Sequence, residues 1–198
     1  MRTIQTRRLR LVPVNEKNAH LLWDVLQEPD LRDFQDLPDL DVSQFERTVA
    51  ARPRRLQASV AGRFEWLIYF ARAGEGRPDE VPLGWVSLRI AERTPTTAEI
   101  GYSVVRAHRE RGIATEAVAA LVGEGFDQAD LRLVRAFCVP ENRASRAVLR
   151  RIGFRDEGVV RHGGTVEGHA VDVVAHNIDR GMWESRKSAT PNRSAIRS

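Results

Sequence analysis

Three positions near the middle of the chain have residue types and a spacing that suit diphosphate binding. Arg109, Gly112 and Ala114 form the pattern Arg-x-x-Gly-x-Ala, directly before a stretch with apolar residues at helical spacing. The first N–H groups of a helix lack partners within it, and the macrodipole makes that end partly positive. Glycine lets an anion approach the backbone, alanine is small and favours helix, and arginine adds charge. The pattern predicts an anion site formed by Arg109, Arg111, Gly112, Ile113, Ala114 and Thr115.

A second segment gives this pattern its context. Alone, Arg-x-x-Gly-x-Ala is weak, because a solvated basic helix start in an arginine-rich chain would look the same. About thirty residues further on, Asn142 and Ser145 open a short amphipathic helical pattern that follows a strand-like stretch. Ile152, Gly153 and Phe154 end that pattern, with glycine as the stop signal. The order strand, turn, helix therefore occurs twice.

Together, the two segments resemble the GNAT superfamily of acyl-CoA-dependent N-acetyltransferases. The opening residues 6–11 and the closing residues 172–174 look like its RimJ/RimL-type branch, which contains the ribosomal-protein alanine acetyltransferases. The resemblance covers roughly residues 5–184. It implies an α/β (α+β) fold with a mixed, mostly antiparallel sheet of about seven strands, flanked by about four helices. It also implies that the sheet splays open between its fourth and fifth strands, with coenzyme A (CoA) in the split.

The resemblance also assigns candidate roles within the site. Acetyl-CoA would be the co-substrate, and backbone N–H groups of Val104 and Val105 would polarise the thioester carbonyl. Asn142 would contact CoA, and Ser145 would donate a proton to its sulfur, although Ser145 also fits an ordinary first-turn helix residue. Glu99 would deprotonate the amine directly or through water, or it would be an exposed strand residue. The sequence departs from the family pattern at one position. Gly164 stands where ribosomal-protein acetyltransferases carry a glutamate, and Glu167 is the nearest acid.

The surrounding chain predicts the elements that must position these residues. The spacing of apolar and β-branched residues predicts seven strands and four helices along the chain. Predicted strands cover 9–14, 65–71, 82–90, 97–105, 133–139, 154–161 and 169–179, with a turn at 74–78; predicted helices cover 17–27, 43–57, 112–128 and 143–152.

Length and composition fit one globular domain. The chain has 198 residues, of which 42% are hydrophobic and 29% charged. The formal charge is +4, and residues 185–198 alone contain four basic residues and no acid, so the remaining body has a net charge near zero. We therefore expect a GNAT domain at 1–184, a disordered basic tail at 185–198, and no nucleic-acid partner.

Other classes of chemistry find little support in the sequence. Cys138 is the only cysteine, which rules out an internal disulfide, and its apolar neighbours suggest a small buried residue. Three histidines recur every seven residues, at 162, 169 and 176, but no cysteine or His-Glu-x-x-His pattern accompanies them. We therefore expect no metal site. No apolar run is long enough to span a bilayer. A cytoplasmic monomer or homodimer is the default expectation.

The acceptor is the least determined feature. Residues 28–41 contain six acids and one arginine, and in GNAT relatives this connection borders the acceptor side of the split. The charge favours a cationic amine acceptor, although a solvated acidic loop without a role would look the same. Three functions stay open: acetylation of a protein N-terminus, acetylation of a small-molecule amine such as an aminoglycoside or polyamine, and a non-catalytic acyl-CoA-binding module.

Overall fold

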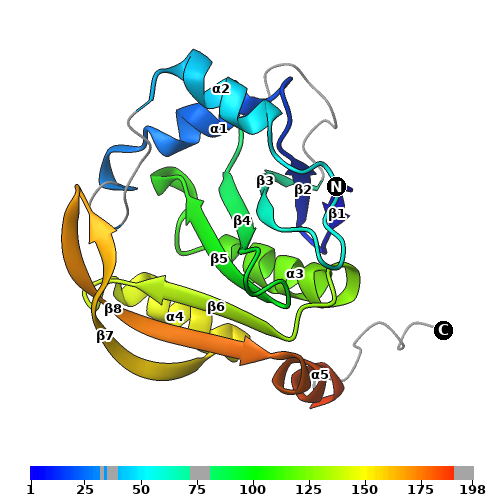
Figure 1. The fold of residues 1–198 in the computed structure, drawn as a ribbon, viewed down its shortest axis with the longest axis vertical. Coiled ribbons are helices and arrows are strands. Elements are labelled where there is room, and N and C mark those ends of the chain that lie inside the picture. The colour runs from blue at the N-terminus through cyan, green and yellow to red at the C-terminus, as the bar shows by residue number, and fades with distance from the viewer. Residues whose placement is uncertain (32–33, 35–39, 72–80, 190–198) are drawn as a thin grey trace.

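The computed structural model describes residues 1–31, 34, 40–71 and 81–189, which form a mixed sheet with helices on both faces (Figure 1). The elements in chain order are β1 (Ile4–Gln5), β2 (Leu9–Pro13), α1 (Ala19–Leu26), the 3-10 helix η1 (Pro29–Leu31), α2 (Val42–Ala50), β3 (Gly62–Phe70), β4 (Gly84–Ile90), β5 (Thr97–Val104), the 3-10 helix η2 (Arg106–His108), α3 (Ile113–Gln128), β6 (Leu133–Cys138), α4 (Arg143–Ile152), β7 (Arg155–Val166), β8 (His169–Asp179) and α5 (Arg180–Ala189).

The strands lie in the order β1-β2-β3-β4-β5-β6-β8-β7, and every neighbouring pair is antiparallel except β5 and β6. That parallel pair is short, because only Thr97–Glu99 pairs with Leu133–Arg135. Beyond Glu99, β5 continues for five residues to Val104 without a β6 neighbour. The sheet therefore splits between these two strands, as the resemblance implied.

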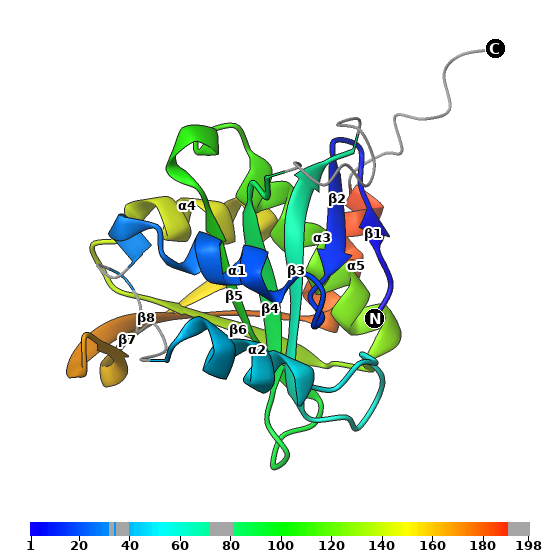
Figure 2. The same cartoon turned by 90° about the horizontal axis from the view of Figure 1, so that it is seen from above.

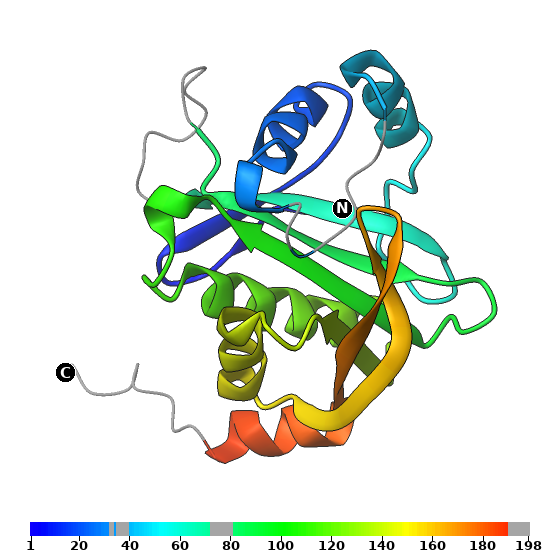
Figure 3. The same cartoon turned by 90° about the vertical axis from the view of Figure 1, so that its left-hand side faces the viewer.

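Two apolar cores hold the helices against the sheet. The larger one joins α3, α4 and α5 to one face, with Leu88, Ile100 and Leu121 among its buried members. The smaller one joins α1 and α2 to the opposite face and includes Trp85 and Phe45. Figures 2 and 3 show this division, with α1 and α2 on one side of the sheet and α3 and α4 on the other. Alternating side chains of β4 and β5 thus belong to different faces.

The second helix is shorter than predicted. It begins at Val42 and ends at Ala50, whereas the sequence pattern indicated 43–57 with Ser43 as its N-cap. The actual cap is Asp41, whose carboxylate accepts a hydrogen bond from the Gln44 amide at 2.7 Å, while the Gln44 side chain accepts from the Asp41 amide at 2.9 Å. This reciprocal capping box satisfies two N–H groups that a Ser43 cap would have left open.

The C-terminal elements extend further than predicted. Strand β7 runs to Val166 rather than about 161, because two irregularities in its pairing with β8 absorb extra residues. Helix α5 continues to Ala189, so residues 185–189 are helical and do not belong to a tail that starts at 185. With the two-residue β1, the described residues contain eight strands and five α-helices instead of about seven and four. The predicted turn at 74–78 lies outside the described residues.

Candidate functional site

Gly112 caps α3 in a conformation that favours glycine. Its φ is +73°, in the left-handed region, and an added Cβ would lie 3.2 Å from Nη2 of Arg8. Among the described residues no side chain caps this helix start, and the first N–H groups of α3 have no partner within the helix. Ala114 and Thr115 line the adjoining cleft, and Ile113, at 2% exposed, anchors the helix in the core. The predicted anion cradle therefore has the expected backbone shape.

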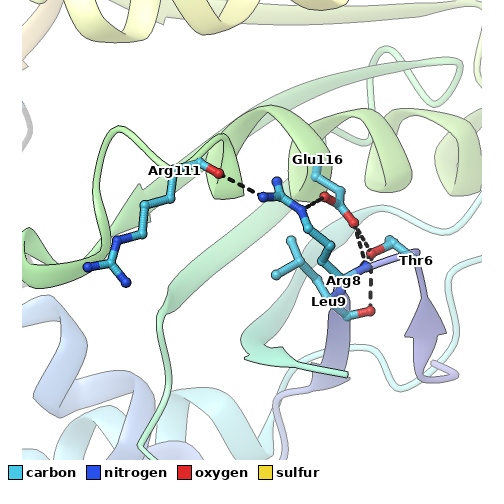
Figure 4. A network of polar contacts seen from close by, with 5 residues as sticks. All are labelled: Thr6, Arg8, Leu9, Arg111 and Glu116. Atoms are coloured by element: carbon cyan, nitrogen blue, oxygen red, sulfur yellow. Dashed lines mark hydrogen bonds and ion pairs between the residues drawn. The ribbon is translucent and has the colours of Figure 1, made fainter. Parts of the chain in front are cut away.

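The two arginines of the motif occupy different positions. The Nε of Arg109 donates to the carbonyl of Val104 at 2.8 Å, so this side chain links the turn to the end of β5. Arg111 contributes its backbone carbonyl, which accepts a hydrogen bond from Nη1 of Arg8 at 3.0 Å. Its own side chain points away from Arg8 (Figure 4). Arg109 lines the cleft together with Gly112.

A buttress from the N-terminal segment fixes the first turn of α3 (Figure 4). Glu116 accepts hydrogen bonds from the Thr6 hydroxyl at 2.6 Å, the Arg8 amide at 2.9 Å and the Arg8 Nε at 2.7 Å. The contacts join residues more than one hundred positions apart in the chain. Thr6 and Arg8 belong to the opening segment 6–11 that carries part of the family resemblance, and no local pattern in the sequence pairs them with Glu116. This buttress is the structural reason for the opening motif.

The ionisation of Glu116 makes this buttress sensitive to acid. Burial opposes the charged form, but the hydrogen bonds from Thr6 and Arg8 outweigh it, so the pKa of Glu116 lies below its ordinary value. A depressed carboxyl pKa stabilises the fold above the unfolded-state pKa and loses that contribution as pH falls through the folded-state pKa. We expect Glu116→Gln to lower the melting temperature at pH 7, and the difference from wild type to shrink below about pH 4. Thermal melts at pH 7 and pH 3 would show it, and an equal deficit at both would contradict it.

The amides at the end of β5 have different partners. The Val105 amide donates to the carbonyl of Leu83 at 2.9 Å, so this N–H is already used within the sheet. Strand alternation turns the Val104 amide to the other side, which is the side of the split and of Arg109. Of the two amides predicted to polarise a carbonyl, only that of Val104 is left for the role.

Ser145 lies in the first turn of α4, where Asn142 and Tyr102 position it through three contacts. Asn142 is the N-cap, and its Oδ1 accepts from the Ser145 amide at 2.9 Å. The Tyr102 hydroxyl lies 2.8 Å from the Ser145 hydroxyl, and it donates to the Ser145 carbonyl at 3.3 Å. Burial raises the pKa of the Tyr102 hydroxyl well above its usual range, so this group stays protonated at neutral pH. Sequence analysis missed Tyr102 because its strand pattern gave no sign of the helix opposite.

Cys138 ends β6 beside the same group of hydroxyls. Burial raises the pKa of its thiol, although a hydrogen bond with Ser145 and the charge of Arg146 oppose this rise. A thiol with a raised pKa carries little thiolate at neutral pH and is a poor nucleophile. The expectation of a small, mostly buried residue is confirmed, since its exposed fraction is 7%.

Glu99 forms an ion pair with a neighbouring strand. Nη2 of Arg89 lies 2.5 Å from its carboxylate, and the two residues are register partners on β4 and β5. Five strand residues, or roughly 17 Å, separate Glu99 from Val104, at about 3.3 Å per residue. The side chain is 39% exposed and lines the cleft. An amine bound at the level of Val104 is therefore out of direct reach, and its proton would have to pass to Glu99 along a chain of several water molecules.

One cleft of about 930 Å³ connects these groups. The end of β5, the start of α3 and the start of α4 line it, together with the β7–β8 hairpin. Gly164 belongs to this lining, and a side chain there would meet Val173, since an added Cβ would lie 2.7 Å from its Cγ1. Glu167 adopts a positive φ of 51° in the turn between β7 and β8 and is exposed. Neither position therefore reproduces the glutamate of the ribosomal-protein enzymes.

The described part of the chain contains neither a metal-binding cluster nor a membrane-spanning helix. Within it, no group of three or more histidine, cysteine or acidic side chains lies close enough to hold a metal ion. Within the same residues, none of the helices combines the length and apolar character needed to cross a bilayer.

A sheet that splits after a short parallel pairing, with a glycine-started helix at the mouth of the split, defines the class of N-acetyltransferase folds. The chain belongs to the GNAT family, because its residues 8–155 match the family model described as an acetyltransferase (GNAT) domain.

Individual relatives agree with this assignment. The chain is 29% identical to the uncharacterised N-acetyltransferase p20 of Bacillus licheniformis, over 90% of this chain and 96% of p20. It is 31% identical to the putative ribosomal N-acetyltransferase YdaF of Bacillus subtilis, over 72% and 73% of the two chains. The structure of RimL, a ribosomal L7/L12 α-N-protein acetyltransferase in complex with coenzyme A, superposes with a TM-score of 0.72 at 20% identity, covering 90% of this chain and 98% of that one.

Proposed function

We propose that this chain transfers the acetyl group of acetyl-CoA directly to a primary amine, without a covalent enzyme intermediate. The observation that carries the proposal is that the uncapped start of α3, the free edge of β5 and the hydroxyl of Ser145 open into one cleft. The presence of CoA in the superposable RimL complex supports the same ligand for this cleft. Gly112, Ala114 and Thr115 would hold the diphosphate, with Arg109 beside it and Asn142 across the split.

The reaction needs few catalytic groups. The Val104 amide would polarise the thioester carbonyl, and the neutral amine would attack the carbonyl carbon. A C–N bond forms, the C–S bond breaks, and the thiolate of CoA leaves with the bonding electrons. Ser145 would protonate that thiolate and recover a proton from Tyr102 or solvent, while the amine proton passes to a base. Because a thiol with a pKa near ~8.5 leaves readily, positioning dominates the rate.

A thiol-release assay with acetyl-CoA distinguishes the functions that stay open. Turnover with any amine excludes a module that only binds acyl-CoA. A preference for peptides with free N-termini favours a protein acceptor, whereas a preference for polyamines or aminoglycosides favours a small-molecule acceptor. If acetyl-CoA raises the melting temperature but no amine releases thiol, the transferase proposal is wrong.

The proposed role of Glu99 is testable by one substitution. Glu99→Gln should lower kcat with little change in the affinity for CoA, because the carboxylate would accept the amine proton along a chain of water molecules and would not touch CoA. The pH–rate profile of the variant should also differ from that of the wild type. The ion pair with Arg89 provides the alternative explanation, and an unchanged rate and pH profile would leave Glu99 as a structural residue only.

A cationic acceptor stays a prediction from the sequence. It rests on the acids of segment 28–41, and Asp33 and Asp36, the two central ones, lie outside the described residues. If those acids attract the acceptor, amines with additional positive charge should react faster at low salt than at high salt.

A further inference from the structure

A row of charged side chains crosses three neighbouring strands at the closed end of the cleft. Arg63 on β3 is the register partner of Arg89 on β4, and Arg89 is the register partner of Glu99 on β5. All three line the same cleft as the proposed acetyl site. Figure 3 shows that α1 and α2 lie over this face of the sheet, opposite α3 and α4.

The row contains more positive than negative charge. Arg63 pairs with the buried carboxylate of Glu65 at 3.0 Å, and that carboxylate also pairs with Arg52. Arg89 pairs with Glu99. Three guanidinium groups therefore share two carboxylates, and each guanidinium carries five N–H donors. Arg63 is 47% exposed and Arg89 is 62% exposed, so both guanidinium groups also face the cleft.

Two like charges directly opposite each other on antiparallel strands oppose folding. Arg63 and Arg89 are such a pair by register, and burial and then the Arg89 charge lower the pKa of Arg63, while the Glu99 charge raises it. An anion placed between the two guanidinium groups would remove this repulsion and accept several charge-assisted hydrogen bonds. The arrangement is therefore complementary to a carboxylate that comes from outside the chain.

Buried or small residues line the cleft between this row and the acetyl site. Trp85, Ser87 and Arg89 follow one another on the same face of β4, and Gly101 lies opposite Ser87 on β5. A Cβ on Gly101 would lie 3.1 Å from Oγ of Ser87 and 3.2 Å from the Trp85 ring, so the glycine keeps the floor free of a projecting side chain. The indole N–H of Trp85 is buried and has no acceptor among the described residues. A backbone carbonyl of a bound chain would satisfy it.

We propose that the acceptor is the N-terminal segment of a protein, extended along β4 and β5, with an acidic side chain held by Arg63 and Arg89. The proposal rests on the acetyltransferase function proposed above. Roughly 17 Å separates the level of Val104 from that of Glu99 and Arg89, which corresponds to about five extended residues. We therefore expect the acid at about the fifth residue of the acceptor.

This spacing separates the proposed ligand from two others. The amine and carboxylate of a free amino acid lie too close together to occupy both ends of the cleft. The diphosphate of CoA would lie at the α3 N-terminus, which follows the opposite end of β5 from Glu99. The arginine row therefore recognises a part of the acceptor and not the co-substrate.

A set of ten-residue peptides tests the proposal with the full chain and acetyl-CoA. Each peptide has a free N-terminus and a neutral background, and a single glutamate moves from the second to the eighth position. We expect kcat/KM to peak with glutamate near the fifth position, about tenfold above alanine there, as one charge-assisted contact would give. A lysine at the same position should lower kcat/KM.

Variants assign the peak to the row. Arg89→Gln should remove it and Arg63→Gln should reduce it, each with an unchanged KM for acetyl-CoA, which reports an intact fold and CoA site. Arg150→Gln, on the exposed part of α4, removes the same charge outside the cleft and should keep the peak. In Glu99→Gln the ratio of the glutamate peptide to the alanine peptide should rise, whatever happens to the rate itself.

The possible failures are distinguishable. Turnover with peptides but no dependence on the position of glutamate, or a preference for lysine, would overturn the arginine-row proposal and leave the transferase function intact. Acetylation of small amines but of no peptide would have the same meaning. If none of the tested amines or peptides leads to thiol release, both the transferase function and the arginine-row proposal are wrong.

Discussion

We expect the Gly112→Trp variant to lose CoA binding. Any side chain at this position must adopt the left-handed conformation, and an indole would fill the space in front of the α3 amides. For wild type, CoA at one hundred times its dissociation constant should contribute about 2.7 kcal/mol to stability. In a domain of this size that is a rise in Tm of roughly 5–10 °C. In the variant the rise should vanish, and kcat/KM for acetyl-CoA should fall by about a hundredfold or more.

Gly158→Trp is the matched control for this experiment. Gly158 also has a positive φ, 93°, and an added Cβ there would meet no atom within 4 Å. It lies on β7 and does not line the cleft. Both variants place a side chain at a positive φ, so Gly158→Trp controls for the cost of that conformation away from the cleft. A normal CoA-induced shift in Gly112→Trp would show that the diphosphate binds elsewhere.

The second large effect should come from Ser145. If its hydroxyl protonates the departing thiolate, Ser145→Ala should lower kcat by ~10²-fold, the lower end of general acid catalysis, and leave CoA affinity nearly unchanged. Tyr102→Phe removes the hydroxyl that lies 2.8 Å from Ser145 and should lower kcat in the same way but less, because solvent can replace it. The double variant should be no slower than Ser145→Ala alone, since the two hydroxyls act in series.

The leaving group separates proton donation from a structural role. A thioester of a more acidic thiol needs no proton to leave, so with such a donor Ser145→Ala should approach the wild-type rate. The variant should stay slow with every donor if the Ser145 hydroxyl only holds the Tyr102 side chain in place through their 2.8 Å contact. Steady-state rates with two donors of different thiol pKa measure this difference.

The parts of the fold that sequence could predict are those with local signals. Helix α4 was predicted with its observed bounds, because Asn142 caps it and Gly153, with a φ of 101°, ends it. Gly112 at the start of α3 was also predicted from a local signal, because a glycine before a helix lets an anion approach its first N–H groups. The predicted end of α2 was wrong because Pro53 follows Ala50 closely, and a proline has no amide to donate within a helix and disfavours a helical residue before it. The capping box of Asp41 and Gln44 sets the true start.

The parts that sequence could not predict depend on contacts between distant segments. Thr6 and Glu116 lie 110 residues apart, and Tyr102 and Ser145 lie 43 apart, so no periodicity brings them together. The cross-strand partner of Glu99 follows from the register of β4 and β5, and a shift of one residue would have placed Arg89 on the other face. Residue types suggest which groups do chemistry, but strand register decides which of them meet.

The short parallel pairing of β5 and β6 also has a consequence for cooperativity. Three residue pairs join a leaf of five strands to a leaf of three, and α3 and α4 provide a second connection by packing on each other. Where only a short backbone ladder joins two parts of a sheet, sub-global opening can occur below the free energy of global unfolding. Amides of β6 and β8 should therefore exchange hydrogen for deuterium independently of those of β3 and β4. A ligand that lies in the split touches both leaves, and it would fuse two cooperative units into one.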